Sequence, residues 1–230
     1  MRSIWRTLDR ALARDIGLVC LADCLVGVSY GAIAVSSGFP LWLPMLMSLL
    51  VFAGASQFMF VGIVAAGGNP FAAVLAGLLA NARHLPFGFA LGDVLGKRWA
   101  ARLAGSHLMI DESVAFALAE REVHRRRAAY WACGIGLFAS WNIGVVAGAY
   151  AGTAISDTDA FGLDAAFPAV LLALVLPSLR DKAARLPVLI GVLVALAATP
   201  FLPAGLPVLL ALAGVLAGVA AKEPELEEAR

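Results

Sequence analysis

The sequence predicts an all-α membrane protein, a polytopic bundle of transmembrane helices. Of its 230 residues, 61% are hydrophobic and only 14% are charged, and the mean hydropathy is +0.88. A soluble chain of this length cannot bury so much apolar surface, so the bilayer is its expected solvent. The apolar runs also lack the two-residue alternation that is typical of membrane barrel strands. Helices are therefore the expected spanning elements.

About seven to eight hydrophobic segments approach the roughly 20 residues that a helix needs to cross the hydrocarbon. They are Ile16–Val35, Leu41–Ala66, Pro70–Leu91, Ala128–Gly152, Asp164–Leu179, Leu186–Thr199 and Leu202–Ala221, with Leu103–Ala119 as a weaker eighth. Asp164–Leu179 and Leu186–Thr199 are short, so we expect local thinning of the bilayer or shielding by neighbouring helices. Together the segments form one transmembrane domain, residues 16–221. A basic N-terminus, residues 1–15, precedes it, and a short charged tail, residues 222–230, follows it.

The first hydrophobic run shares two features with a signal peptide, because arginines precede it and it reaches the small residues "AIA" at Ala32–Ala34. Asp23 interrupts the run, however, and an aspartate is unusual in the core of a cleavable leader. We therefore expect a first helix that is retained.

The distribution of Lys and Arg predicts the orientation in a cell membrane. Apart from Arg83, the basic residues lie in four stretches, Arg2–Arg14, Lys97–Arg127, Arg180–Arg185 and Lys222–Arg230. Both termini are therefore expected in the cytoplasm. Three apolar runs lie between the basic stretches at Arg14 and Lys97. Three crossings would place these two stretches on opposite sides of the membrane, whereas their charge predicts that both are cytoplasmic. Either one run is a re-entrant pair of half-helices, or Leu103–Ala119 is a true span and Lys97, Arg98 and Arg102 are external.

A weak internal repeat is a further option for the architecture. The stretch "GVSYGAIA" (Gly27–Ala34) resembles "GVVAGAYA" (Gly144–Ala151), and Gly38 and Pro44 are spaced like Gly162 and Pro168. With 23 glycines in the chain, chance is the competing explanation. Internal repeats are common in secondary transporters.

The stretch "NARHLPFG" (Asn81–Gly88) predicts a broken helix within the run Pro70–Leu91. Pro86 disrupts the preceding turn, so the first half-helix is expected to end near Ala80 or Asn81, and Pro86 suits the first position of the second. Asn81, Arg83 and His84 would then serve the freed backbone or a substrate. Arg83 has a structural role, in which it ties down carbonyls at the break or extends to the interface, or it takes part directly in substrate or ion handling.

Other polar residues at or near membrane depth are also candidates for function. Ser56 and Gln57 form a polar island that either bonds between helices or binds substrate. The candidate proton carriers are Asp23, His84, His107, Asp111 and Glu112. His107 and Asp111 are one helical turn apart and are expected to share a face. If Leu103–Ala119 lies along the interface, the His107–Asp111 pair is simply solvated. For Asp23, the alternative to proton transfer is a local polar contact within the bundle.

Three segments together resemble the AzlC-type large subunit of two-component branched-chain amino acid exporters. They are "SLLVFAGASQF" (Ser48–Phe58), "NARHLPFG" and "HLMIDESVAFALA" (His107–Ala119), within a resemblance that runs from about Gly17 to Gly218. The resemblance implies export of valine, leucine, isoleucine or analogues together with a small AzlD-like membrane subunit. Asp23 departs from the proline-containing first helix of better-known members, which leaves the substrate open.

The residues are compatible with secondary transport of a zwitterion. The chain has no "GxxxxGK[ST]" motif for an ATPase of its own, and neither "HExxH" nor "GxSxG" for an intramembrane hydrolase. A substrate carboxylate is expected near Arg83 and the half-helix that begins at Pro86. The ammonium group has Gln57, Asn81, an acidic side chain or free carbonyls as candidate partners. A passive channel and an assembly subunit are the alternative functions.

Overall fold

The structure is a computed structural model, which describes residues 8–154, 172, 176, 178–203, 205–216 and 218. Throughout these residues the regular secondary structure is helical, as the sequence predicts. The helices are α1 (Arg10–Ser36), α2 (Trp42–Leu50), α3 (Gly54–Ala65), α4 (Pro70–Asn81), α5 (His84–Ala90), α6 (Trp99–His107), α7 (Asp111–Ala119), α8 (Val123–Thr153), α10 (Lys182–Ala198) and α11 (Leu206–Leu210), with a short 3-10 helix at Ser178–Arg180.

The chain divides into two compact units. The first consists of Met1–Gln57 and Asn81–Phe161, and the second of Phe58–Ala80 and Gly162–Arg230. The predicted boundaries of one domain over residues 16–221 stay a prediction.

Two helices in the described part of the chain are long and apolar enough to cross a membrane. They are α1 and α8, which contain the predicted spans Ile16–Val35 and Ala128–Gly152. Leu186–Thr199 coincides largely with α10, whereas Asp164–Leu179 lies mostly outside the described residues. The total number of crossings stays a prediction.

Three of the predicted segments are interrupted. The break within Pro70–Leu91 is confirmed, because α4 ends at Asn81 and α5 begins at His84. The prediction of one continuous helix over Leu41–Ala66 is wrong, because the chain leaves the helical path at residues 51–53, between α2 and α3. Leu103–Ala119 is not a continuous span either, since residues 108–110 separate α6 from α7.

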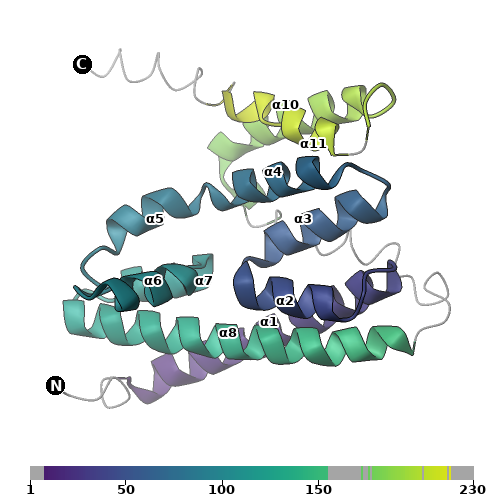
Figure 1. Ribbon diagram of the computed structural model, residues 1–230. Helices are drawn as coiled ribbons and strands as arrows, with labels where there is room; N and C mark the ends of the chain where they lie inside the picture. Colours follow the sequence, from purple (N-terminus) through teal and green to yellow (C-terminus); the bar gives the residue numbers. More distant parts are fainter. Residues whose placement is uncertain are drawn as a thin grey trace, which may run out of the picture. The chain divides into compact units, whose positions relative to one another are not determined.

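The first unit is built on close packing of α1 along α8 (Figure 1). Five glycines bring the two backbones together, Gly27 and Gly31 on α1 and Gly144, Gly148 and Gly152 on α8. A Cβ atom at Gly27 would lie 2.8 Å from the carbonyl oxygen of Trp141, and one at Gly148 would collide with the carbonyl oxygen of Val28. Small residues at this spacing let two helix backbones approach closely in a membrane.

The contacts between α1 and α8 are reciprocal. Gly27 faces the carbonyl of Trp141, which lies three residues before Gly144. Gly144 in turn faces the carbonyl of Cys24, which lies three residues before Gly27. Partner numbers rise together along both helices, so the two helices run parallel. This is the pattern expected of two repeats related by a two-fold axis along the helices. The repeat itself stays a prediction, and its second element, Gly162 and Pro168, lies outside the described residues.

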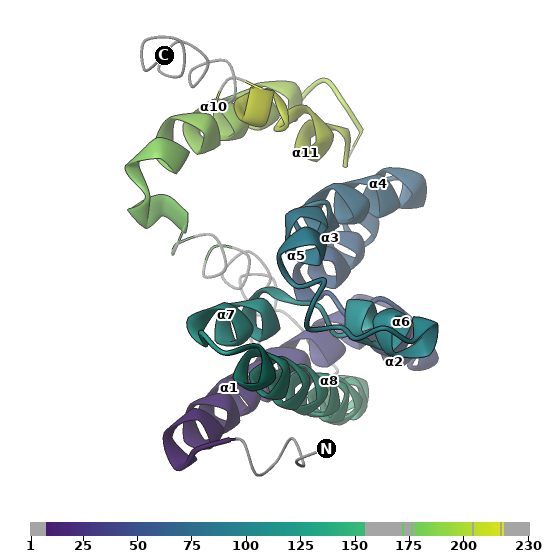
Figure 2. The same ribbon diagram turned by 90° about the vertical axis from the view of Figure 1, so that its left-hand side faces the viewer.

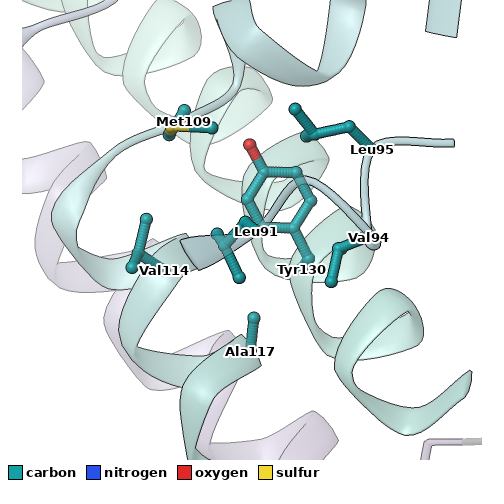
Figure 3. Packing of buried hydrophobic residues seen from close by; sticks show 7 residues of the cluster. All are labelled: Leu91, Val94, Leu95, Met109, Val114, Ala117 and Tyr130. Atoms are coloured by element: carbon teal, nitrogen blue, oxygen red, sulfur yellow. The ribbon is translucent and has the colours of Figure 1, made fainter. Parts of the chain in front are cut away.

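Helices α2 and α7 also lie against α8 (Figure 2). A cluster of buried residues fills the space beside α8, centred on Tyr130, whose ring lies among the apolar side chains of the other elements (Figure 3). The cluster comprises Leu91, Val94, Leu95, Met109, Val114, Ala117 and Tyr130. The Tyr130 hydroxyl donates to the carbonyl of Gly105 at 2.6 Å, which satisfies its one polar atom.

Two arginines at the start of α8 tie this helix to its neighbours. Arg125 binds Glu120 at 2.6 Å and Asp9 at 2.9 Å, and so joins the ends of α7 and α1. Its hydrogen bond lowers the pKa of Glu120, while the Leu12 N–H and then Arg125 lower the pKa of Asp9. Arg126 donates to the carbonyl of Ala90, the last residue of α5, at 3.0 Å.

The second unit has its own apolar contacts. Ile63, Ala73 and Ala76 form its buried cluster, against which Leu209 of α11 packs. Helix α10 packs on the segment that follows α11, where Gly214 faces the carbonyl of Pro187 so closely that a Cβ atom would collide with it.

The α1–α8 contact predicts that Gly148→Ala destabilises the protein. Alanine is the better helix former by about 1 kcal/mol, but its Cβ atom would overlap the carbonyl oxygen of Val28. Overpacking of this kind costs about 1–3 kcal/mol. Thermal unfolding of the detergent-purified protein is expected to show a lower midpoint.

The matched control is Gly17→Ala, because a Cβ atom at Gly17 of α1 has nothing within 4 Å. This variant is expected to be as stable as the original protein or slightly more stable. A Gly148→Ala variant that unfolds no earlier than the Gly17→Ala control would contradict the packing argument.

Candidate functional site

Three helix breaks of the first unit are tied to one another by side chains. Ser56, just after the first break, donates to Asn81 Oδ1 at 2.7 Å, at the edge of the second. Arg83 in the second break contacts Asp111 Oδ2, at the start of α7, at 2.8 Å. Phe52 in the first break lies beside His107, at the end of α6, with ring centroids 6.2 Å apart. The three breaks therefore form a single polar and aromatic site.

The second break is narrower than the sequence predicts. Helix α5 begins at His84, not at Pro86, so the predicted first position of Pro86 is wrong by two residues. The physical reason is that the first four N–H groups of a helix lack intrahelical partners, so a proline costs little at the third position as well. The N–H of Leu85, in the first turn of α5, donates to the carbonyl of Ala82, which lies between the two helices, at 3.1 Å.

Arg83 and Asp111 form an accessible ion pair. Their side chains are 43% and 48% exposed, and Asp111 opens the first turn of α7. The positive end of a helix favours a carboxylate there. Glu112 follows Asp111 and interacts electrostatically with Arg83 and with His84. One guanidinium, one imidazole and two carboxylates thus meet at the second and third breaks.

His84 bonds to the backbone at the break. Its Nδ1 lies 3.0 Å from the carbonyl oxygen of Asn81. Because that oxygen only accepts, Nδ1 carries a proton, and in the neutral ring Nε2 is then an acceptor. Nε2 is buried and has no hydrogen-bond partner in the part of the chain that the structure describes.

Gln57 is fully buried, and both ends of its amide are engaged. Nε2 donates to the carbonyl of Met47 at 3.0 Å, at the end of α2, and Oε1 accepts from the indole N–H of Trp141 at 3.1 Å. Nearby, Ser48 donates to Asn142 Oδ1 at 2.7 Å. These bonds anchor the first break to α8, and they favour a structural role for Gln57 over its alternative role in binding.

His107 and Asp111 do not share a helix face, so the expectation from their spacing is wrong. The break at residues 108–110 separates them, because Ser113 Oγ accepts from the N–H of Ile110 at 3.1 Å and donates to the carbonyl of Leu108 at 3.0 Å. These bonds satisfy backbone groups that a continuous helix would have used. His107 lies instead beside Phe52 and Phe138, whose ring centroid is 5.5 Å from its own.

Asp23 is brought to Glu112 and to α8. Its carboxyl group interacts electrostatically with Glu112 and with the Ser140 side chain of α8. Oδ2 is buried and has no partner among the described residues. Ser140 follows Asp23 by 117 residues, the same separation as Gly27 and Gly144 in the two similar stretches.

Four residues of the site went unnoticed in the sequence. Phe52 and Phe138 carry no signal, because apolar residues are abundant in every span. Ser140 and Asn142 did carry one, since "SWN" is a polar island in an otherwise apolar run. The predicted residues Ser56, Asn81, Arg83, His84, Asp111 and Glu112 are all brought to the breaks, while their roles stay predictions.

A family model described as AzlC protein matches residues 19–155, more than half of the chain. All the site residues described above lie within this stretch. No solved structure matches the chain.

Three curated proteins are similar to parts of the chain. The branched-chain amino acid transport protein AzlC of Bacillus subtilis (strain 168) is 31% identical over 90 residues, which are 39% of this chain and 35% of that protein. The inner membrane protein YgaZ of Escherichia coli (strain K12) is 31% identical over 167 residues, 67% of this chain and 62% of YgaZ. An uncharacterized membrane protein of Haemophilus influenzae (strain ATCC 51907 / DSM 11121 / KW20 / Rd) is 32% identical over 79 residues, 32% of each chain. The matches thus span less than two thirds of each relative.

The bonds of Gln57 predict that Gln57→Leu lowers stability without changing substrate affinity. The substitution keeps a similar side-chain volume but removes a partner from the Met47 carbonyl and the acceptor of the Trp141 indole N–H. The Met47 carbonyl keeps the N–H of Val51, so the expected cost is that of the indole N–H, about 1–3 kcal/mol. Thermal unfolding and substrate-induced stabilisation, measured on the same sample, separate the two effects.

Ser29→Ala is the control, because Ser29 donates only within its own helix, to the carbonyl of Leu25 at 3.2 Å. Little change in stability is expected from it. Normal stability of Gln57→Leu combined with weakened substrate binding would instead assign Gln57 to the binding site.

Proposed function

Because the chain belongs to the AzlC protein family, we propose that it is the large subunit of a secondary-active exporter of valine, leucine, isoleucine or analogues. The printed name of the Bacillus subtilis relative, a branched-chain amino acid transport protein, supports the substrate class. The name of the Escherichia coli relative supports the inner membrane as its location. The observation that carries the proposal is the accessible Arg83–Asp111 pair at the joined helix breaks.

Arg83 is the proposed partner of the substrate carboxylate. Its guanidinium is half-exposed, and its planar donors match a carboxylate in a two-point contact. The contribution expected from the end of the second half-helix is not carried over, because α5 begins at His84 and has only seven residues. Recognition of the carboxylate therefore rests on Arg83.

The rings of Phe52 and Phe138 are the proposed neighbours of the aliphatic side chain. They pack edge to face, with centroids 5.1 Å apart, and both lie beside His107 at the third break. An aliphatic side chain gains free energy from burial against such rings, roughly 25 cal/mol per Å². This supports selection for branched aliphatic amino acids over polar ones.

The orientation and the partner belong to the same proposal. The basic stretches at Arg2–Arg14 and Lys222–Arg230 support cytoplasmic termini. A small AzlD-like membrane subunit is the proposed partner, on the ground of the family alone. Efflux should then be saturable, should depend on a gradient and should need both subunits.

Efflux from cells that lack other amino acid exporters tests this function. The chain is expressed with and without its small partner, and intracellular leucine, valine and isoleucine are loaded as dipeptides. Saturable efflux that collapses with the gradient supports the transporter. Unsaturable efflux would indicate a channel, and a chain that co-purifies with its partner but never moves substrate would indicate an assembly subunit.

Arg83→Ala is expected to weaken apparent substrate affinity about tenfold or more, since a charge-assisted contact contributes roughly 1.5–3 kcal/mol. Arg83→Lys should restore affinity only in part, because an ammonium lacks the planar fork of a guanidinium. Efflux kinetics and substrate-induced thermal stabilisation are the measurements.

Arg14→Ala provides the matched control, because Arg14 and Asp15 form another exposed pair, with 3.0 Å between Nη2 and Oδ1. Exposed pairs contribute only about 0–1 kcal/mol to stability, so both variants should fold. A folded Arg83→Ala variant that exports normally would end the binding-site proposal.

We further propose that Asp23 and Glu112 carry the coupled proton. Asp23 has a buried oxygen without a partner in the described part of the chain. Glu112 interacts electrostatically with Asp23, with Arg83 and with His84. A carboxyl group inside a membrane protein is expensive and typically marks a proton or ion path. His107 is the weaker candidate, because its neighbours are two phenyl rings.

Asp23→Asn is expected to abolish coupling in a protein that still binds substrate. The amide keeps the shape of the side chain, but it cannot take up a proton. One coupled proton supplies about 1.4 kcal/mol per pH unit, so the accumulation ratio should fall about tenfold per pH unit of imposed gradient. Transport into inside-out vesicles at several imposed gradients measures this.

Asp15→Asn, on the exposed side of the same helix, is the control and should respond to the gradient as the original protein does. An Asp23→Asn protein whose accumulation still follows the pH gradient would refute the coupling role.

A further inference from the structure

We infer that Asp111 binds the ammonium group of the substrate, and that an amino acid enters the site by replacing the two ends of the Arg83–Asp111 ion pair. The inference rests on the proposed function and deepens it, because it assigns the second pole of the zwitterion and a route of entry. The chemical class that the site takes is then the free α-amino acid, with both charged groups present.

The geometry of the ion pair supports its exchange. Arg83 meets Asp111 through one nitrogen–oxygen contact of 2.8 Å, whereas a guanidinium has five N–H donors. Arg125, by contrast, holds Glu120 through two nitrogens, at 2.6 and 3.0 Å, and Asp9 in addition. Three hydrogen bonds hold Arg125 in place, whereas Arg83 has N–H donors left for a second carboxylate.

Exposure of the pair points in the same direction. With side chains 43% and 48% exposed, Arg83 and Asp111 are not enclosed by the protein, so a ligand can reach both of them. The exchange also leaves no charge uncompensated, because the carboxylate of the substrate takes Arg83 and its ammonium group takes Asp111.

The other candidates for the ammonium group are engaged elsewhere. The amide of Gln57 is buried and bonded at both ends, and Asn81 Oδ1 accepts from Ser56. Glu112 interacts with Asp23 and His84 as well as with Arg83. Of these groups, only Asp111 directly contacts Arg83, the proposed partner of the substrate carboxylate.

Backbone placement gives Asp111 a fixed position. It begins α7, and the break before it is closed by Ser113, which accepts from the N–H of Ile110 and donates to the carbonyl of Leu108. Val114 and Ala117, on the same helix, are buried in the cluster around Tyr130 (Figure 3). The carboxylate is thus carried by a helix end that is anchored independently of Arg83, and it stays in place when the pair opens.

The test compares three probes that differ in the charged groups they carry. Binding is measured on the chain purified with its small partner. Leucine has both charges, 2-hydroxyisocaproate keeps the carboxylate and side chain without the ammonium, and leucinamide keeps the ammonium without the carboxylate. Binding is followed by thermal stabilisation and by competition with labelled leucine. The original protein is expected to prefer leucine to either analogue by about tenfold or more, the size of a charge-assisted contact.

Asp111→Asn is expected to lower the affinity for leucine and for leucinamide about tenfold. The affinity for 2-hydroxyisocaproate should stay unchanged or rise, because Arg83 is then released from its ion pair. Arg83→Ala is expected to give the converse pattern, with leucinamide spared. Asp111→Glu keeps the charge and should retain the preference for leucine over the hydroxy acid. Asp15→Asn, in the exposed pair with Arg14, should change none of the three.

The outcomes distinguish this inference from the function on which it rests. If Asp111→Asn weakens leucine and 2-hydroxyisocaproate equally, or weakens neither, Asp111 does not bind the ammonium, while export of leucine still stands. If Asp111→Asn does not fold, loss of the leucine preference in the folded Asp111→Glu variant overturns the inference as well. If none of the three probes binds the original complex and no leucine is exported, the proposed function itself fails.

Discussion

The close contact of α1 with α8 is the constraint on which the rest of the first unit depends. Glycines on both helices bring the backbones together, and a single Cβ atom at Gly148 would collide with a carbonyl oxygen. Because α8 is fixed in this way, the side chains along it act as anchors for the broken elements. From its start to its middle these anchors are Arg125 to α7, Arg126 to α5, Tyr130 to α6, Trp141 to α3 and Asn142 to α2.

The anchors explain how non-helical backbone persists in so apolar a chain. Exposed amide groups in lipid cost several kcal/mol each, so a break survives only where protein or a wet cavity covers it. In the first break Gln57 takes the Met47 carbonyl, and in the third Ser113 serves the backbone groups of Leu108 and Ile110. Some polar residues of these spans therefore satisfy the backbone at the breaks, while others, such as Arg83 and Asp111, stay partly exposed.

The sequence predicts only those breaks that have a local cause. In "NARHLPFG" the proline and the polar run are enough to place the end of α4 at Asn81. The break at residues 51–53 has no such signal, because "LLVFA" reads as continuous helix and its partners, Trp141 and Asn142, come from about 90 residues further on. His107 and Asp111 illustrate the same limit. Their spacing fits a helix face, yet the bonds of Ser113 divide the helix between them.

For the site, residue type identified the charged members, and tertiary contacts identified their partners. Arg83 and Asp111 are conspicuous in the sequence because charges are expensive at membrane depth. That they pair with each other, and that Gln57 is committed to Trp141, depends on where α7 and α8 lie. Phe52 and Phe138 illustrate the opposite case, since nothing in an apolar run distinguishes a ring that lines a site from one that faces lipid.

Glu112 gives the proposed site a physical means of linking substrate to proton. It interacts electrostatically with Arg83 and His84 on one side and with Asp23 on the other. When a substrate separates Arg83 from Asp111, the arrangement of charges around Glu112 changes, and with it the balance of protons between Glu112 and Asp23. Linkage is reciprocal, so proton occupancy must alter substrate affinity by the same factor. The two functions need no long pathway between them, because one carboxylate belongs to both.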